Sequence, residues 1–219
     1  MVQKKAKPAS ATSSKRPRGR PRSYDPERAL RQALEAFWTH GYSGTSLDDL
    51  GAAMGMNRPS LYAAFGDKQD LYLKALESYW EEAVVAMRAL LLRDEPLTAA
   101  LMRIFDAALS LYFPPSAAPR GCFGISTAAV ESIAEPRIRA AFEGGLRRID
   151  KEFERRIARA VDAGELPATA NPRALAELAS ALLHTLAIRS RYGATRKELR
   201  RLAERGVTHM LKAWPGTPA

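Results

Sequence analysis

The chain has 219 residues, a net charge of +10 and one cysteine. This length suffices for one small domain and one medium domain, while a single cysteine excludes an intrachain disulfide framework and a multi-cysteine zinc site. The longest apolar run is far too short to span a bilayer, and no apolar segment follows the N-terminal lysines, so the sequence predicts a soluble, cytoplasmic protein without a membrane partner.

The excess positive charge lies at the N-terminus. Residues 1–22 hold eight basic side chains and no acidic one, whereas the rest of the chain is nearly neutral. A basic arm suits phosphate binding, because each neutralised phosphate releases counterions. The alternative is an inert solubilising leader, since such compositions are common in disordered tails.

One part of this arm has a more specific pattern. Residues 16–22 read RPRGRPR, which resembles the core of an AT-hook. Glycine allows the backbone to lie deep in the minor groove, and proline keeps it extended. We expect Arg18, Arg20 and Arg22 to enter the minor groove of A·T-rich DNA beside the main DNA contact.

Beyond residue 24, apolar residues recur at three- and four-residue spacing, which predicts an all-α fold. The first helix opens at the Asp25-Pro26-Glu27 segment and ends at Gly41. A second begins near Thr45, whose hydroxyl is expected to cap free amides, and runs to about Ala53. A short helix over 58–64 and a long one over 68–93 follow.

The remaining helices are predicted over 96–113, 121–133, 136–163, 172–191 and 195–213. Prolines and glycines interrupt the pattern between them. The long helix over 68–93 carries no glycine or proline, so it can connect two domains.

The second and third helices have the spacing of a helix-turn-helix. Gly51 lets the helices cross closely, Gly55 accepts a positive φ at the turn, and Leu61 locks the second helix onto the others. Leu50, Met54 and Met56 would complete a small core. An ordinary helical hairpin is the alternative on spacing alone.

A longer pattern resembles the N-terminal signature of the TetR/AcrR family of transcriptional regulators. It comprises GY at 41–42, TSLDDL at 45–50 and LYAAFGDKQDLY at 61–72, and the similarity extends over residues 25–72. The resemblance implies a homodimeric repressor that binds a palindromic operator in double-stranded DNA and responds to a small-molecule effector. The domains would then be an arm over 1–22, a helix-turn-helix domain over 23–70, an effector-binding and dimerisation domain over 71–213, and a tail over 214–219.

The resemblance also implies which residues contact DNA. Thr45 and Ser46 would bind a phosphate together with free amides. Arg58 would grip guanine through two donors at a base edge, and Tyr62 and Lys68 would contact the DNA backbone. The full set is Thr45, Ser46, Arg58, Pro59, Ser60, Tyr62 and Lys68.

The region after residue 70 carries no nucleophile–base motif, acidic metal cluster or phosphate-binding glycine loop, which argues against an enzyme, a metal or a cofactor. The resemblance implies instead an effector pocket between the helices, although aromatic and methionine residues at this spacing also form ordinary cores. Candidate lining residues are Trp80, Met87, Phe105, Leu109, Tyr112, Phe113, Cys122, Phe123, Thr127, Phe142 and His184.

An apolar stripe with small neighbours predicts where two copies associate. In the family the last two helices form a two-fold, four-helix interface, which would place two recognition helices about one DNA turn apart. The expected interface residues are Leu175, Leu178, Ala179, Leu182, Leu183, Leu186 and Leu202.

Cys122 is expected at the amino end of a helix and beside Arg120. Both features would stabilise a thiolate and favour a sensor of electrophiles or oxidants, whereas an inert, space-filling thiol is the alternative. Three hypotheses follow: a repressor released by an effector, a regulator acting through Cys122, and a constitutive architectural DNA-binding protein in which the arm dominates.

Overall fold

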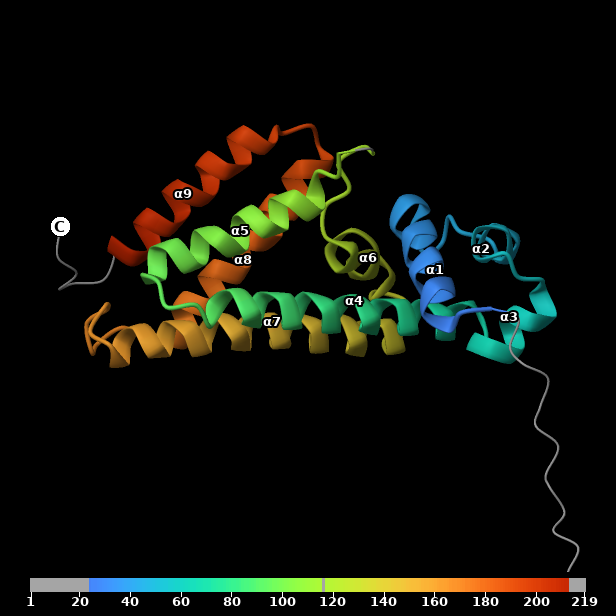
Figure 1. Ribbon diagram of the computed structural model, residues 1–219, viewed down its shortest axis with the longest axis horizontal. Helices are drawn as coiled ribbons and strands as arrows, with labels where there is room; N and C mark the ends of the chain where they lie inside the picture. The colour runs from blue at the N-terminus through green and yellow to red at the C-terminus, as the bar shows by residue number, and fades with distance from the viewer. Residues whose placement is uncertain (1–23, 116, 213–219) are drawn as a thin grey trace, which may run out of the picture.

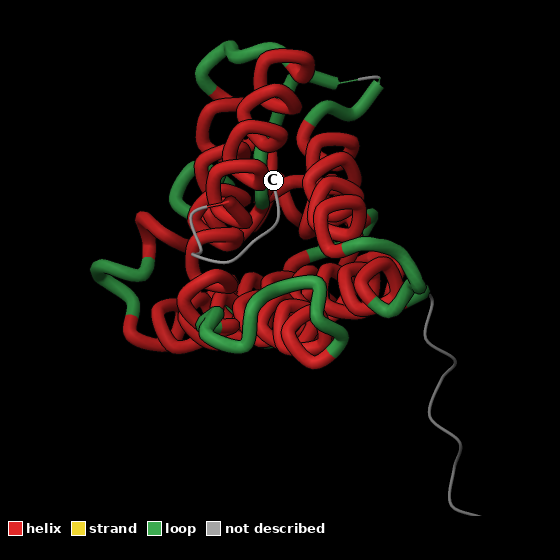
Figure 2. The backbone as a smooth tube through the Cα atoms, turned by 90° about the vertical axis from the view of Figure 1, so that its left-hand side faces the viewer, coloured by secondary structure: helices red, strands yellow, loops and turns green. Residues whose placement is uncertain are grey.

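A computed structural model describes residues 24–115 and 117–212. In these two ranges every regular element is a helix, and no strand is found (Figure 2). The prediction of an all-α fold is therefore confirmed.

Three helices, α1 (Pro26–His40), α2 (Leu47–Met54) and α3 (Arg58–Phe65), form one end of the molecule (Figure 1). The start of α1 follows from its sequence, because the Asp25 carboxylate accepts hydrogen bonds from the amides of Glu27 and Arg28. Gly41, at φ +77°, ends the helix as expected.

The fourth helix, α4 (Lys68–Leu91), begins with a capping box in which the side chains of Asp67 and Asp70 each accept from the other's backbone amide. Its 24 residues span about 36 Å. α4 begins at α3 and continues beneath the larger group of helices, so it is shared by both parts of the molecule (Figure 1).

The larger part has two layers. α4 and α7 (Pro136–Asp162) lie side by side in one layer, and α5 (Leu97–Tyr112), α8 (Pro172–Arg191) and α9 (Arg196–Lys212) lie above them (Figures 1 and 2). The predicted bounds of α8 agree with the structure, and those of the other long helices differ by one or two residues.

The helix predicted over 121–133 is found over residues 123–131, but it is not an α-helix throughout. The chain forms a π-helical turn, η1 (Gly124–Ala128), in which the Ala129 amide bonds to the Gly124 carbonyl, and only then α6 (Ala129–Glu131). The wider turn suits local packing. Gly124 lies against the Trp80 ring, with no room for a Cβ, and the Thr127 hydroxyl bonds to both the Phe123 carbonyl (2.8 Å) and Tyr72 Oη (2.6 Å).

Aromatic rings join the two parts of the molecule. Tyr72 of α4 packs edge-on against Phe37 of α1, with centroids 5.1 Å apart. Trp38 of α1 and Tyr79 of α4 lie 5.3 Å apart, and Phe123 contacts both rings at 5.6 Å. Since these rings are buried, the contact between the two parts is a packed core with little freedom to slide.

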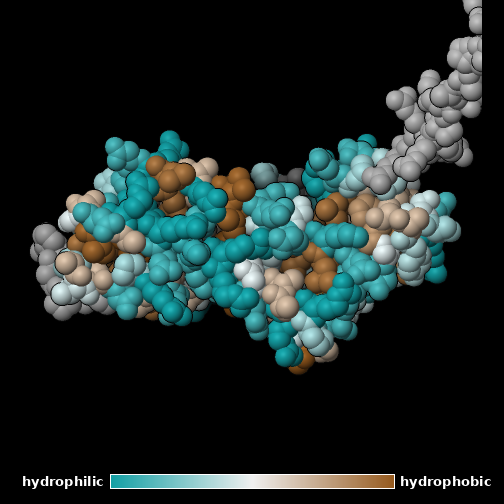
Figure 3. All heavy atoms as spheres, turned by 90° about the horizontal axis from the view of Figure 1, so that it is seen from below, coloured by the Kyte–Doolittle hydropathy of each residue, from teal (hydrophilic) through white to brown (hydrophobic). Residues whose placement is uncertain are grey.

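The outer face of the α4–α7 layer is mainly hydrophilic, with scattered apolar spots (Figure 3). In the part of the chain that the structure describes, no helix combines the length and hydropathy that crossing a membrane requires.

Candidate nucleic-acid interface and internal cavity

The start of α2 is held by Ser46. Its hydroxyl accepts from the Asp49 amide (3.1 Å), and the Asp49 carboxylate accepts from the Ser46 amide (2.8 Å). The expectation that Thr45 caps this helix is wrong: Thr45 is fully buried, and its hydroxyl donates to the Gly41 carbonyl (2.6 Å). Ser46 is exposed, so a phosphate can reach it, but its hydroxyl and amide both donate to the Asp49 carboxylate. The buried Thr45 side chain is not accessible to a phosphate.

The turn before α3 has the expected chemistry. Gly55 adopts a left-handed conformation at φ +62°, and a Cβ on Gly51 would press against the Met56 carbonyl. Asn57 caps α3 by accepting from the Ser60 amide (2.9 Å). The sequence therefore specifies a tight turn between two short helices.

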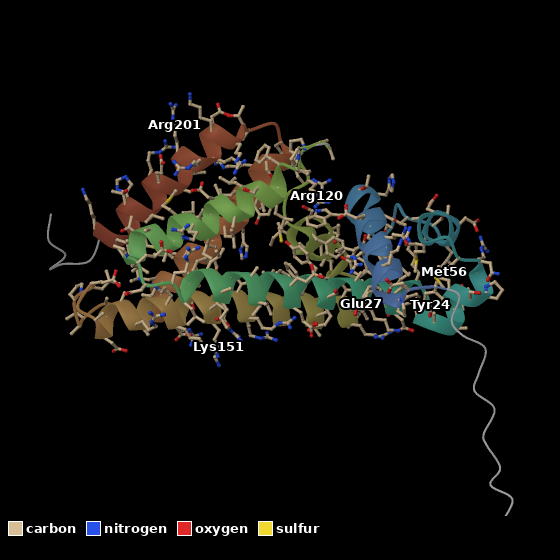
Figure 4. The ribbon with its side chains drawn as sticks, in the orientation of Figure 1. Tyr24, Glu27, Met56, Arg120, Lys151 and Arg201 are labelled. Atoms are coloured by element: carbon tan, nitrogen blue, oxygen red, sulfur yellow. The ribbon has the colours of Figure 1, made fainter. Side chains whose placement is uncertain are left out.

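One face of α3 is buried and the other is exposed. Leu61 and Phe65 are in the core, while Tyr62 is 48% exposed. Arg58, Pro59, Ser60 and Tyr62 thus share the open surface at the end of the molecule where Figure 4 labels Met56.

Arg58 makes a two-pronged ion pair with Asp48 of α2. Arg58 Nε donates to Asp48 Oδ1 (2.8 Å), and Nη2 donates to Oδ2 (2.6 Å). Both side chains are exposed, at 57% and 73%. The hydrogen bond and charge of Arg58 lower the pKa of Asp48, so the carboxylate is ionised at neutral pH. Asp48 was not among the predicted site residues.

Lys68 lies at the first position of α4, with its Nζ 4.5 Å from the centre of the Tyr42 ring. Partial burial lowers the pKa of this lysine, although its ordinary value is far above neutral pH. The ammonium group is held against the ring, at the junction of α3 and α4.

The structure also indicates where the basic arm joins this surface. The Tyr24 ring packs against Phe65 of α3, with centroids 6.1 Å apart, and Figure 4 shows Tyr24 beside α3. The predicted arm residues Arg18, Arg20 and Arg22 lie outside the described residues. Residues 24–70 contain seven acidic and four basic side chains, so this part of the chain alone is net negative.

A cavity of about 150 Å3 lies between α4, α5, α7 and α8 and opens toward solvent beside the exposed residues Ala86, Ala107 and Leu111. It borders five of the predicted pocket residues, Trp80, Met87, Tyr112, Cys122 and His184. Among the described residues that line it, none is Asp, Glu, Lys or Arg. The complete lining is Tyr79, Trp80, Ala83, Ala86, Met87, Leu90, Ile104, Ala107, Ala108, Leu111, Tyr112, Cys122, Ile149, Leu183 and His184.

The other predicted pocket residues do not border this cavity. Phe105 is fully buried and packs against Phe153, with centroids 6.3 Å apart. Phe123 and Thr127 lie at the junction with α1 and α4. There Phe123 packs against Trp38, and the Thr127 hydroxyl is hydrogen-bonded to Tyr72. The complete set outside the cavity is Phe105, Leu109, Phe113, Phe123, Thr127 and Phe142.

Cys122 is buried in the cavity wall, and Tyr79 Oη lies 3.1 Å from its Sγ as a donor. Burial raises the pKa of the Cys122 thiol, outweighing the lowering effect of this hydrogen bond and of the Ile125 and Gly124 amides. The expected help from Arg120 is absent because its guanidinium pairs with Glu35 (2.5 Å). The expectation of a stabilised thiolate is therefore wrong.

A connecting segment, made of residues 113–115 and 117–123, contacts both the cavity wall and α1. The Arg120 amide donates to the carbonyl of Tyr112 (3.0 Å), a cavity residue. The Arg120 carbonyl accepts from Trp38 Nε1 (3.3 Å), and its guanidinium lies 3.8 Å from the centre of the Trp38 ring. Figure 4 shows Arg120 next to α1. The cavity wall is thus tied to the three-helix end.

The predicted dimer stripe on α8 is only partly available. Leu175, Ala179 and Leu186 are buried inside the protomer, and Leu183 lines the cavity, so these residues cannot meet a partner without rearrangement. Packing against α7 occupies this side of α8.

A different face of α8 is open. Leu178, Ile188 and Tyr192 are 56%, 46% and 85% exposed. With Ala181 and Thr185 they recur at three- and four-residue spacing, which places them on one side of the helix. Leu182 and Leu202 are partly buried beside them. We call Leu178, Ala181, Thr185, Ile188 and Tyr192 the α8 stripe.

Among the described residues no group of three or more His, Cys, Asp or Glu side chains could hold a metal ion.

Comparisons with known proteins agree on the family. Residues 29–75 match the model described as bacterial regulatory proteins, tetR family, and residues 98–205 match the tetracyclin repressor-like C-terminal domain. The transcriptional repressor ComR of Escherichia coli K12 is 30% identical over 201 residues, which is 92% of this chain and 94% of ComR. The regulator YezE of Bacillus subtilis 168 is 33% identical over 148 residues, covering 68% of this chain and 76% of YezE.

Solved structures give the same result. A cysteine mutant of the TetR family regulator CifR, in complex with 26-base-pair operator DNA, is 30% identical with a TM-score of 0.79, covering 90% of this chain and all of that one. The reduced form of Escherichia coli NemR shares the fold, with a TM-score of 0.75 at 18% identity, covering 89% of this chain and 98% of that one.

Proposed function

This chain belongs to the TetR family of transcriptional regulators, and we propose that it represses transcription as a homodimer that binds operator DNA and is released by a small molecule. Members of this family are regulators and not enzymes. The observation that carries the proposal is the continuity of α4, which starts beside the exposed face of α3 and lines the cavity further along. Since the proposed partner is operator DNA, we place the protein in the cytoplasm.

The proposed DNA contacts come from the exposed starts of three helices. Ser46 and the first-turn amides of α2 bind a phosphate. Arg58 enters the major groove with Pro59 and Ser60, while Tyr62 and Lys68 contact the backbone on either side. Support comes from the shared open face of these residues and from the operator-bound CifR relative.

We include the basic arm in the DNA-binding unit. Because residues 24–70 are net negative, the attraction to phosphate has to come largely from elsewhere in the chain. Residues 1–22 carry eight positive charges and join at Tyr24, which packs beside α3. Arg18, Arg20 and Arg22 then reach the minor groove next to the major-groove contact.

For the dimer, we propose that the α8 stripe meets its own symmetry mate. The large side chains of the stripe, Leu178, Ile188 and Tyr192, are apolar and exposed in the isolated protomer, and a two-fold interface requires the same self-complementary patch on both copies. Partly buried Leu182 and Leu202 lie at its edge. The proposed domains are residues 23–70 for DNA binding and 71–213 for effector binding and dimerisation.

The cavity is the proposed effector site. Its size suits a compact molecule, and the absence of ionised groups from its described lining favours an uncharged one. The tyrosine hydroxyls of Tyr79 and Tyr112 and the imidazole of His184 supply hydrogen-bonding groups. A ligand that pushes Tyr112 or Cys122 shifts the connecting segment, and with it Arg120 and α1.

The DNA-binding proposal is tested by selecting duplexes from a library with 20 randomised base pairs, followed by gel-shift titration. We expect a palindromic consensus bound at least about a hundredfold more tightly than unrelated duplex. A lower ratio with no consensus would contradict the repressor and favour the constitutive architectural protein.

The effector proposal is tested with a library of uncharged small molecules, screened by thermal shift on the full chain. A true effector raises the melting temperature and releases the selected duplex in the gel shift. Tyr112→Phe should weaken binding of a ligand that uses the hydroxyl while leaving DNA binding unchanged. If stabilising ligands never release DNA, regulation through this cavity is excluded.

A further inference from the structure

We propose that Asp48 is a positioning residue that holds Arg58 in the orientation needed to select guanine in the operator. The inference rests on the proposed DNA-binding function. It concerns how the protein selects one base, and substitutions in the ion pair between α2 and α3 can test it.

The geometry of the pair leaves Arg58 able to bind two partners at once. Asp48 takes the Nε–H and one Nη2–H, which form one edge of the guanidinium plane. The adjacent edge, formed by Nη1–H and the second Nη2–H, points away from the carboxylate because the group is planar and rigid. That edge has the spacing of two parallel donors, as guanine O6 and N7 require.

The position of the pair matches this role. Arg58 is the first residue of α3, and Asp48 lies in the first turn of α2, both on the surface that also presents Ser46 and Tyr62. Two fixed hydrogen bonds join side chains from different helices, so the guanidinium cannot swing freely toward neighbouring bases. Ordering the long arginine side chain before binding reduces the entropy lost on binding.

A fixed guanidinium is also selective. Adenine presents an N6–H2 donor where guanine presents the O6 acceptor, so an aligned arginine meets a donor and loses one bond. A free arginine could turn to a phosphate instead. Asp48 adds a further constraint, since its negative charge is repelled by phosphates and weakens non-specific contact around Arg58.

The experiment compares base preferences of the full chain and its variants, using the same randomised duplex library. Arg58→Ala identifies the base position that Arg58 specifies, because guanine preference should disappear there. Asp48→Asn should lose guanine preference at that same position and keep the rest of the consensus. The dissociation constant is then measured for the consensus duplex and for the same duplex with that guanine changed to adenine. The change should weaken binding by the wild-type protein about tenfold or more, and binding by Asp48→Asn less than about threefold.

Glu27→Gln is the matched control for charge. It removes one acidic group from α1, where the Glu27 carboxylate pairs with Arg31 at 4.0 Å and does not contact Arg58, and should leave guanine preference unchanged. Thermal unfolding of Asp48→Asn should be close to wild type, because an exposed ion pair contributes little stability. Asp48→Glu, which keeps a carboxylate, should restore part of the preference.

Two results would overturn the inference. If Asp48→Asn binds all duplexes more tightly and keeps the guanine preference, Asp48 is a competitor that DNA displaces. If its preference changes at a position other than that of Arg58, Asp48 acts elsewhere. A wild-type chain that selects no consensus would instead refute the proposed function, which distinguishes the two failures.

Discussion

Cys122 illustrates how burial decides the reactivity of a single side chain. Its thiol is enclosed in the cavity wall, and burial raises the pKa of Cys122. Since the thiolate is the nucleophile, we expect iodoacetamide to alkylate the native protein at pH 7 at least about tenfold more slowly than free cysteine. Because the chain has one cysteine, mass spectrometry gives the rate without ambiguity.

The unfolded protein in urea is the control for this rate and should react like free cysteine. Native alkylation faster than free cysteine would contradict the burial argument and support the sensor hypothesis for Cys122. The sequence shows a cysteine near an arginine, but the pairing of Arg120 with Glu35 and Trp38 depends on the folded arrangement.

His184 should make the free energy of unfolding depend on pH, with a sign that follows from its burial. Burial lowers the pKa of this cavity residue below its ordinary value of 6.5, partly offset by Asp150. Below pH 6.5 His184 is therefore protonated more readily in the unfolded chain than in the folded chain. The free energy of unfolding should decrease as the pH is lowered through this window. Urea unfolding at pH 7.5 and 5.5 measures the loss.

In His184→Gln this loss should be smaller, because the titrating group is gone. Carboxylates with lowered pKa values, such as Glu152 beside Arg88, lose their contribution only at lower pH, beneath the ordinary carboxyl value of 4.5. An equal loss in wild type and His184→Gln would show that other groups cause it.

At the scale of helices, two adjacent glycines of α7 provide a matched pair. A Cβ on Gly145 would overlap the Trp80 ring of α4, whereas a Cβ on Gly144 meets only the end of the Arg147 side chain at 4.0 Å. We expect Gly145→Ala to lower the free energy of unfolding by about 1–3 kcal/mol or more through overpacking. Gly144→Ala should raise it by up to about 1 kcal/mol, because alanine favours helix.

Urea unfolding of both variants checks this prediction, and the opposite signs control for the general effect of removing glycine. Equal effects would mean that the α4–α7 contact can adjust to a methyl group.

Local chemistry explains which elements the sequence predicts. Asp25 with Pro26, and Asn171 with Pro172, mark helix starts within a few residues, so α1 and α8 begin where expected. η1 could not be predicted, because its wide turn depends on Trp80 and Tyr72, which are distant in sequence. Part of the cavity lining was also not predicted. Small residues such as Ala83 and Ala108 create the space, whereas the sequence pattern pointed to aromatic residues.

For the whole molecule, the proposed dimer depends on the α8 stripe. Leu178 and Ile188 are exposed in the protomer, so Leu178→Glu or Ile188→Glu should fold normally yet place repelling, desolvated charges in the interface. Sedimentation analysis should find monomers, and binding to the selected palindromic duplex should weaken.

Val85→Glu is the control, since Val85 is also apolar and 66% exposed but lies on α4. It should leave the dimer intact. If the two α8 variants remain dimeric, the interface lies elsewhere. The sequence predicts an interface on α8, but which of its faces is open depends on how α7 packs against it.

Charge distribution gives a second prediction at this scale. Deleting residues 1–22 removes the three proposed contacts of Arg18, Arg20 and Arg22 from each protomer. Each contact that neutralises a phosphate contributes about 0.9 to the slope of log K against log salt, so the slope should fall by about 5 for a dimer. Gel-shift titrations at several salt concentrations measure this slope. An unchanged slope would identify the arm as an inert leader, which was the alternative from its composition.

The stacking of Trp38 under Arg120 and the position of Trp80 in the cavity wall give the molecule two native fluorophores at informative places. The sequence has one further tryptophan, Trp214, and Trp214→Phe removes its emission. In the Trp214→Phe variant, Trp80 emission should change when a ligand enters the cavity. Trp38 emission should change when the Arg120 guanidinium moves relative to its ring. Stopped-flow mixing with a ligand would then give the order in time of cavity occupation and movement at the DNA-binding end.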